Sequence, residues 1–266
     1  MKLDNAKKIS MSKILEALRE NEHNIAPVLN NIGQHLKESG VPHSAADAIR
    51  WAEIMLGKSP SVQSIQYVDN AADQSLSIKS IVPVSDIGLQ HYFIKRKIQI
   101  AKVIKYANQA WVFNYKTQKS FVALTFKNES GGDEIVNQHI ASTSGKQDIT
   151  FIRGKIYKPK GLHIFKNILD FLALLSFKKV DVLNEDSIIL NSWSNLSKVT
   201  PYIKGYGYKF ICCWLEDSNT GRAATISIRD FIKTEVGTRF INMVNFYKEN
   251  VSLYDWYLNY SDNPSS

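Results

Sequence analysis

Short apolar segments alternate with amphipathic helical segments over residues 161–260, and this alternation constrains the fold more than any other feature of the sequence. The apolar segments predict strands, and they are 162–165, 187–190, 209–215 and 240–244. The segments between and after them predict helices, and they are 168–175, 194–203, 223–233 and 252–258. Strands that alternate with helices favour a parallel, doubly wound sheet with helices on both faces.

The residues before this region follow a different period. Segments 110–115 and 120–126 alternate apolar and polar side chains and predict a hairpin, with further strands at 133–137 and 149–153. A helical element is expected over 83–105. The predicted fold class is therefore α/β, or α+β overall, with a small β-rich lobe before the parallel sheet.

The whole chain divides into five expected parts. Their ranges are a helical N-terminal region at 1–67, a polar linker at 68–80, the β-rich lobe with its helix at 81–160, the parallel-sheet domain at 161–260, and a disordered tail at 261–266. The helical prediction at the N-terminus rests on apolar residues at helical spacing, and the linker prediction on small polar side chains.

Composition limits the kinds of function. The net charge of +8 and pI near 9.2 suit a polyanionic partner such as nucleic acid. The two cysteines, Cys212 and Cys213, are adjacent, so a zinc site of paired cysteines is excluded. No apolar run reaches the roughly 18 residues that a membrane span needs, and the polar N-terminus lacks the apolar core of a signal peptide. We expect a cytoplasmic protein with no membrane partner.

Four stretches carry a resemblance to a known family. They read LTFKNESGGDEIVN at 124–137, LHIFKNILDFLALL at 162–175, FICCWLEDSNTGR at 210–222 and YKENVSLYDWYL at 247–258. In this order and at this spacing they resemble the Toprim-domain, primase-like proteins of plasmids and mobilizable elements. The resemblance implies a Toprim-like sheet, a nucleic-acid partner, and a Mg²⁺ site made of clustered carboxylates.

The acidic positions that the resemblance implies are replaced in this chain. The family has a glutamate followed by glycine where Lys166 and Asn167 stand, and two aspartates where Glu216 and Ser218 stand. A lysine–aspartate pair of the closing segment becomes Val251 and Ser252. The resemblance therefore implies a degenerate site with no catalytic residues, no metal and no cofactor. The zinc ribbon that begins active relatives is absent too, since no cysteine precedes Cys212.

Some acidic residues remain near the replaced positions, and each allows two interpretations. Asp170 could pair with Lys166 one helical turn away, or be a residual metal ligand. Glu216 and Asp217 follow a strand, which is where ligands bind in open α/β sheets, or they form a solvated turn. Glu134 could face the same cleft. Mg²⁺ is expected only if these acids still form an active site.

Basic and aromatic residues give candidates for nucleic-acid contact. A strand-binding groove is expected where the β-rich lobe meets the parallel sheet. The glycine-interrupted stretch at 202–209 makes Tyr206 and Tyr208 the least core-like aromatics of the chain. The predicted contact residues are Arg153, Lys155, Lys158, Lys160, Lys166, Tyr206, Tyr208 and Arg222.

Three functions stay open from the sequence. The first is a catalytically degenerate primase-like protein that binds nucleic acid, in particular single-stranded DNA, during replication or mobilisation of a mobile element. The second is a module that binds a protein partner in replication, defence or counter-defence. The third is a surviving Mg²⁺-dependent primase or nuclease that uses Asp170, Glu216 and Asp217.

Overall fold

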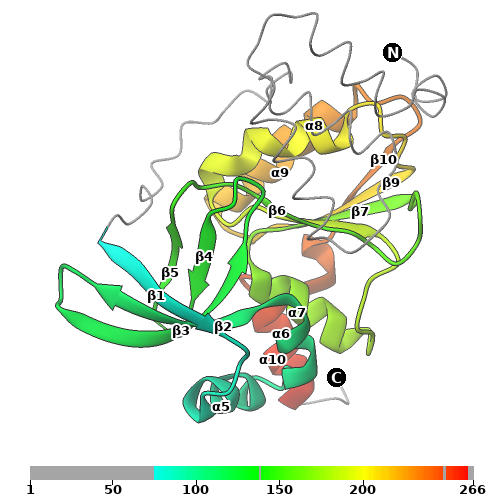
Figure 1. Ribbon diagram of the computed structural model, residues 1–266. Helices are drawn as coiled ribbons and strands as arrows, with labels where there is room; N and C mark the ends of the chain where they lie inside the picture. The colour runs from blue at the N-terminus through cyan, green and yellow to red at the C-terminus, as the bar shows by residue number, and fades with distance from the viewer. Residues whose placement is uncertain (1–74, 138, 248–249, 263–266) are drawn as a thin grey trace, which may run out of the picture.

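The computed structural model describes residues 75–137, 139–247 and 250–262, which form two sheets with helices packed between and around them (Figure 1). The helical region predicted at 1–67 and most of the predicted tail lie outside the described residues. None of the described helices combines the length and the apolar character that crossing a bilayer would require.

The first sheet is an antiparallel meander in which each strand pairs with the next along the chain. Its strands are β1 (Leu76–Val82), β2 (Asn108–Asn114), β3 (Lys119–Lys127), β4 (Asp133–Val136) and β5 (Ala141–Ser144). The predicted hairpin of 110–115 and 120–126 is confirmed as β2 and β3, with Val112 opposite Phe121. The fifth strand, β5, was not predicted, because its sequence Ala-Ser-Thr-Ser carries no apolar alternation.

The predicted linker at 68–80 is wrong over its last residues. Leu76–Ser80 belongs to β1, where Leu76 pairs with Asn114 and Ile78 pairs with Val112. Leu76 is buried beside Ala110 and Val112 in the core of this sheet. Ser77, between Leu76 and Ile78, lies on the other face of the strand, so its polarity does not mark a linker.

Two helices connect β1 to β2 and pack under the first sheet. They are α5 (Ile87–Lys95) and α6 (Ile100–Tyr106), where the sequence predicts a single helical element over 83–105. The chain breaks this element at Lys97, whose φ of 55° lies in the left-handed region. Asp86 caps α5 by accepting a hydrogen bond from the Leu89 N–H at 2.7 Å.

The second sheet has the strand order β10-β9-β7-β8-β6. Its strands are β6 (Thr150–Ile152), β7 (Gly161–Phe165), β8 (Asp186–Ile189), β9 (Phe210–Trp214) and β10 (Arg239–Asn242). The pairs β10–β9, β9–β7 and β7–β8 are parallel. The strand predicted at 149–153 was placed in the β-rich lobe, but β6 pairs antiparallel with β8 at the edge of this second sheet.

Helices cover both faces of the parallel sheet, as the alternation predicts. They are α7 (Ile168–Phe177), the 3-10 helix η1 (Trp193–Val199), α8 (Thr200–Ile203), α9 (Asn219–Ile232), the 3-10 helix η2 (Val244–Tyr247) and α10 (Leu253–Asp262). One face packs on η1, α8 and α9, while the other packs on α7 and α10, and Figure 1 shows α8 and α9 on the side of the sheet opposite α7 and α10. The predicted fold class is confirmed, whereas the predicted division into domains stays a prediction.

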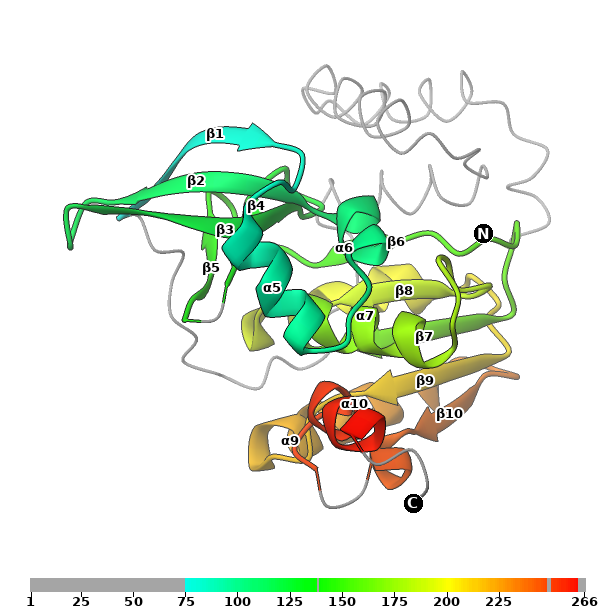
Figure 2. The ribbon, with the colours of Figure 1, turned by 90° about the horizontal axis from the view of Figure 1, so that it is seen from below.

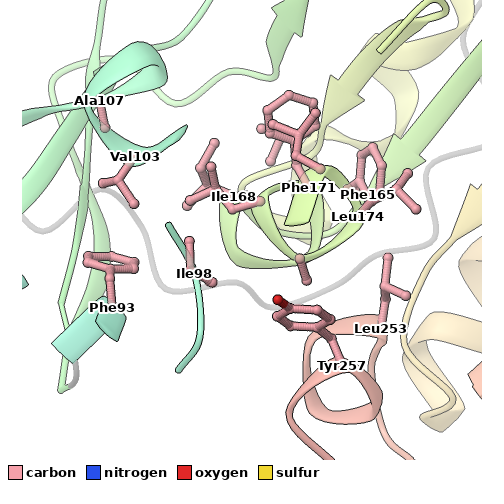
Figure 3. Close-up of a cluster of buried hydrophobic side chains, with 14 of the residues drawn as sticks. Phe93, Ile98, Val103, Ala107, Phe165, Ile168, Phe171, Leu174, Leu253 and Tyr257 are labelled. Atoms are coloured by element: carbon pink, nitrogen blue, oxygen red, sulfur yellow. The ribbon is translucent and has the colours of Figure 1, made fainter. Parts of the chain in front are cut away.

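The core on the α7 face joins the two sheets into one packed body. Side chains of α5 and α6 meet those of α7 and α10 there, as Figure 3 shows for Val103, Ile168 and Tyr257. The hydroxyl of Tyr257 also donates to the Lys97 carbonyl at 2.9 Å. Because this core is shared, side chains of the first sheet can reach the edge of the second.

Candidate functional site

The candidate site lies where two neighbouring strands send the chain in opposite directions. After β7 the chain enters α7 on one face of the sheet, and after β9 it enters α9 on the other face. In open α/β sheets this point, outside the carboxyl ends of the strands, is where ligands bind. Lys166 follows β7 directly, and Glu216 and Ser218 follow β9.

Lys166 is the central cation of this edge. Its side chain is half-buried, and its Nζ donates to the Asn191 carbonyl at 2.9 Å and lies 5.1 Å from the centroid of the Trp193 ring. Its charge lowers the pKa values of Glu134, Asp170 and Glu216, against the larger effect of their burial. An ammonium of the chain thus acts on three carboxyl groups at once.

Asp170 is fully buried in the first turn of α7. Its Oδ1 accepts a hydrogen bond from the Tyr254 N–H of α10 at 2.9 Å, while its Oδ2 has no hydrogen-bond partner among the described residues. Burial, reinforced by the charges of Glu216 and Asp255, raises the pKa of Asp170 to about 7. The residue therefore caps α10, and its protonation state changes near neutral pH.

Glu134 reaches the same neighbourhood from β4 of the first sheet, and it too is buried. Its Oε1 accepts from the Asn128 amide at 2.7 Å and its Oε2 from the Thr143 hydroxyl at 2.8 Å. Burial is the main reason that the pKa of Glu134 rises to about 7, and the charge of Asp148 adds to it. Both oxygens are committed to neighbours within the first sheet.

Ser218 and Ser252, which the resemblance matches to aspartates of the family, are helix caps. Ser218 is the N-cap of α9, with its Oγ accepting from the Gly221 N–H at 3.0 Å. Ser252 lies just before α10, with its Oγ accepting from the Asp255 N–H at 3.2 Å and donating to the Asp255 carboxylate at 2.9 Å. Serine is a preferred residue at such positions, because its hydroxyl satisfies an N–H that the helix leaves free.

The remaining residues of the acidic turn have separate surroundings. Burial raises the pKa of Glu216, and the charge of Asp255 raises it further. Asp217 forms a surface ion pair with Arg222 at 3.2 Å. Gly221 lies so close to the Glu216 carbonyl that a Cβ there would overlap it, which explains the glycine in this turn.

A divalent metal does not fit this set of residues. Among the described residues no three or more His, Cys, Asp and Glu side chains are placed to hold a metal ion. Lys166 puts a positive charge among the acids, and the Glu134 oxygens and the Asp170 Oδ1 already accept hydrogen bonds. Mg²⁺ needs closely spaced oxygen ligands with negative charge, and these acids do not supply them.

The structure contradicts the expectation that Tyr206 and Tyr208 are exposed. They are only 8% and 1% exposed and belong to the core between the parallel sheet and α9. Their rings stack with centroids 4.2 Å apart. Gly205 and Gly207 have positive φ angles of 65° and 90°, which turn the chain so that both rings point inward. Neither ring can stack on a base in this arrangement.

Arg153, another predicted contact residue, is also committed inside the protein. Its Nη1 lies 3.2 Å from the Asp186 carboxylate and 3.0 Å from the Tyr206 hydroxyl. The same carboxylate, fully buried, accepts from the Tyr208 hydroxyl at 2.7 Å and from the Gly154 N–H at 2.9 Å. Arg153 therefore neutralises a buried acid, a role that sequence reasoning missed.

The predicted basic groove is divided between two opposite edges of the sheet. Lys166 and Arg222 lie at the carboxyl edge, whereas Lys155, Lys158 and Lys160 are exposed in the loop between β6 and β7, at the amino edge. Figure 2 shows this loop at the end of the sheet away from the first sheet. Lys160 and Lys166 are six residues apart, and this distance along an extended strand is roughly 20 Å. One short strand of nucleic acid would not contact both groups directly.

The raised pKa values of Asp170 and Glu134 predict a pH-dependent stability. Each folded-state pKa of about 7 lies above the ordinary value, so each contribution is fully present below about pH 4 and is lost as the pH rises through 7. As the pH rises from about 5.5 to 8, the ionisation of each carboxyl group should lower the free energy of unfolding by about 2 kcal/mol. His163 works in the opposite direction, since burial lowers its pKa.

Asp170→Asn isolates the effect of one group, because the amide oxygen can still accept from the Tyr254 N–H but cannot ionise. Urea unfolding of wild type and variant across this pH range should give a variant whose stability falls less, by about 2 kcal/mol. An Asn259→Ala variant, at an exposed position of α10, serves as the control and should keep the wild-type slope. Equal slopes for wild type and Asp170→Asn would contradict the assignment.

Comparisons with known proteins cover different parts of the chain. A family model described as "Domain of unknown function (DUF8464)" matches residues 78–145, which span the first sheet and its two helices. No curated protein matches. Among solved structures, the chain is similar to the crystal structure of the primase fragment of the bacteriophage T7 primase-helicase protein, with 13% identity, coverage of 73% of this chain and 79% of that chain, and a TM-score of 0.46.

Proposed function

We propose that this protein is a catalytically degenerate, primase-like protein that binds nucleic acid without a divalent metal. The observation that carries the proposal is the position of Lys166, whose ammonium acts on Glu134, Asp170 and Glu216 at the edge where the resembling family binds Mg²⁺. A fixed cation there balances the acids that remain. It cannot bring a nucleotide phosphate and an attacking group together as a metal ion with open positions does.

The serine caps support the same proposal. Ser218 and Ser252 stand where the family has aspartates, and each now satisfies a helix N-terminus. The residues of the former acidic positions thus stabilise α9 and α10. Such a set of replacements keeps the scaffold folded while it removes metal ligands.

The proposed partner is nucleic acid because the chain is basic and because the family it resembles acts on nucleic acid. The net charge of +8 favours a polyanion, and charge of this size speeds association with one. We assign single-stranded DNA of a replicating or mobilised element as the natural ligand. The finer part of this assignment rests on the resemblance.

The test is fluorescence anisotropy of labelled single-stranded and duplex oligonucleotides, repeated over a range of salt concentrations and with EDTA. The proposal predicts tighter binding of the single strand, log-linear weakening with salt, and no effect of EDTA. Loss of binding in EDTA would favour the Mg²⁺-dependent enzyme. Absence of binding at low salt would contradict the nucleic-acid proposal and favour the protein-partner module.

A further inference from the structure

Four basic residues begin, or lie beside the beginning of, four neighbouring strands of the parallel sheet. The Lys209 N–H donates to the Lys160 carbonyl at 2.7 Å, and the Arg239 N–H donates to the Lys209 carbonyl at 2.9 Å. These contacts place the three residues at the amino ends of β7, β9 and β10, with Arg239 in register with Phe210, one residue beyond Lys209. On the other side of β7, the Lys155 N–H donates to the Leu183 carbonyl at 2.8 Å, just before β8. We call these four residues the basic row.

The basic row is exposed and makes no ion pair with a carboxylate of the described residues. All four side chains are exposed. No carboxylate of the described residues lies within 4.0 Å of any of their charged nitrogens. The acids nearest in sequence are engaged elsewhere: Glu185 lies 3.6 Å from His163, and Glu235 accepts from the Gly205 N–H at 2.9 Å.

More lysines surround the row because helices of an α/β sheet end at its amino edge. The helices α7, α8 and α9 are followed directly by exposed basic residues, which are Lys178, Lys179, Lys204 and Lys233. The charges of Lys178, Glu185 and Arg239 all act on the Cys212 thiol, so one acidic and two basic side chains approach the same place. Lysines at helix C-termini are common because they offset the helix dipole, but none of the basic row lies on a helix.

The loop before β7 adds an aromatic side chain to this surface. Tyr157 is 60% exposed, and the Lys158 ammonium lies 5.2 Å from the centroid of its ring. An exposed ring beside cations can stack on an unpaired base, and stacking of this kind tolerates any base sequence. A ligand that carries phosphates but no bases could not stack on the Tyr157 ring.

We infer that the basic row and Tyr157 form a binding surface for the backbone and a base of single-stranded nucleic acid. This surface lies at the edge of the sheet opposite Lys166. The three steps between four strands span roughly 14 Å at the usual strand spacing. Phosphates follow one another at about 3.4 Å along each strand of a duplex, and further apart in an extended single strand, so the row matches a run of a few nucleotides. This assignment rests on the proposed function, and it states where on the protein the single-stranded nucleic acid binds.

The experiment measures anisotropy of a labelled single-stranded oligonucleotide, over a range of salt, with the full chain and two triple variants. The row variant is Lys160→Glu/Lys209→Glu/Arg239→Glu. The control is Lys95→Glu/Lys105→Glu/Lys119→Glu, which changes the net charge equally at exposed positions far from the row. We expect the row variant to bind at least roughly 30-fold more weakly at low salt and to lose about 2 from the slope of log affinity against log salt. The control should keep the wild-type slope.

Tyr157→Ala tests the base contact separately. It should weaken single-strand binding by roughly 5- to 100-fold and leave duplex binding unchanged. A second arm adds inorganic polyphosphate as competitor, which should displace the oligonucleotide less well than an unlabelled oligonucleotide of equal charge. Melting temperatures of all variants exclude loss of folding as the cause of any change.

Each outcome decides the inference. If wild type binds but the row variant binds with the wild-type slope, the location is wrong while the proposed function stands. Equal losses in the row variant and its control would show binding by net charge alone, which also overturns the location. Polyphosphate that competes equally well, together with an unaffected Tyr157→Ala, would make the surface a general polyanion site. No binding by wild type would remove the proposed function itself.

Discussion

Arg153→Met is expected to lower the free energy of unfolding by about 3 to 5 kcal/mol, because it leaves the buried Asp186 carboxylate without its cation. Asp186 is fully buried, and Arg153 Nη1 lies 3.2 Å from its Oδ2. The Tyr208 hydroxyl and the Gly154 N–H would still donate to the carboxylate. They carry no charge, so they do not replace the attraction that the Arg153 guanidinium supplies to the buried anion.

Urea unfolding of the variant measures this effect, with Lys155→Met as the matched control. Lys155 is two residues away, is exposed and belongs to the basic row, so its replacement should change stability by less than about 0.5 kcal/mol. The two variants also separate structure from binding. Lys155→Met should weaken oligonucleotide binding without loss of stability, whereas a stable Arg153→Met variant would contradict the structural role assigned to Arg153.

Lys166→Glu is expected to lower the free energy of unfolding by about 2 to 3 kcal/mol in EDTA, since it adds an anion where Glu134, Asp170 and Glu216 lose their cation. The pKa values of these acids should rise further, because the charge that lowers them is removed. Lys166→Met removes the cation without adding an anion, so we expect about half the loss. Urea unfolding of both variants gives the comparison.

Added Mg²⁺ or Mn²⁺ should distinguish the same three proteins. The new carboxylate of Lys166→Glu lies with Glu216 at the carboxyl edge, so a divalent cation should restore part of its stability. Wild type and Lys166→Met should show no such recovery. A Lys166→Glu variant as stable as wild type in EDTA would mean that Lys166 does not balance these acids.

The sequence predicts those parts of the fold that depend on local pattern. The strands β7, β8, β9 and β10 are short apolar runs, and the helices between them have apolar faces at helical spacing, so the parallel sheet follows. The break between α5 and α6 does not follow, because the left-handed backbone of Lys97 leaves no mark on the periodicity. The sheet that contains β6 depends on a long-range partner, β8, which its three residues do not reveal.

The sequence predicts which residues lie at the candidate site, but it predicts few of the hydrogen bonds that they make. The family resemblance points to Lys166, Glu216 and Ser218, and the structure places all three at the carboxyl edge. The sequence does not indicate that Asp170 caps α10, because the Tyr254 N–H comes from a segment 84 residues away. Tyr206 was misplaced for a related reason, since nearby glycines indicate a turn but not the direction in which the turn sends the ring.

The sequence contains a pattern that indicates the basic row, namely basic residues near the starts of strands. Lys160, Lys209 and Arg239 each lie within two residues of the first residue of a predicted strand. Once the strands are known to be parallel and adjacent, their first residues must share one edge. The order β10-β9-β7-β8 is needed to see that the charges are neighbours, and that order comes from the structure.

We propose that the Lys166 ammonium takes the place of a divalent metal at the carboxyl edge. The most direct measurement is a titration of the wild-type protein with Mn²⁺, followed by the electron paramagnetic resonance signal of the free ion. The account predicts that the signal grows as it does in buffer, while Lys166→Glu/Ser218→Asp depletes it. A wild-type protein that itself depletes free Mn²⁺ stoichiometrically, and loses this ability in Glu216→Gln, would contradict the account and restore a metal-dependent site.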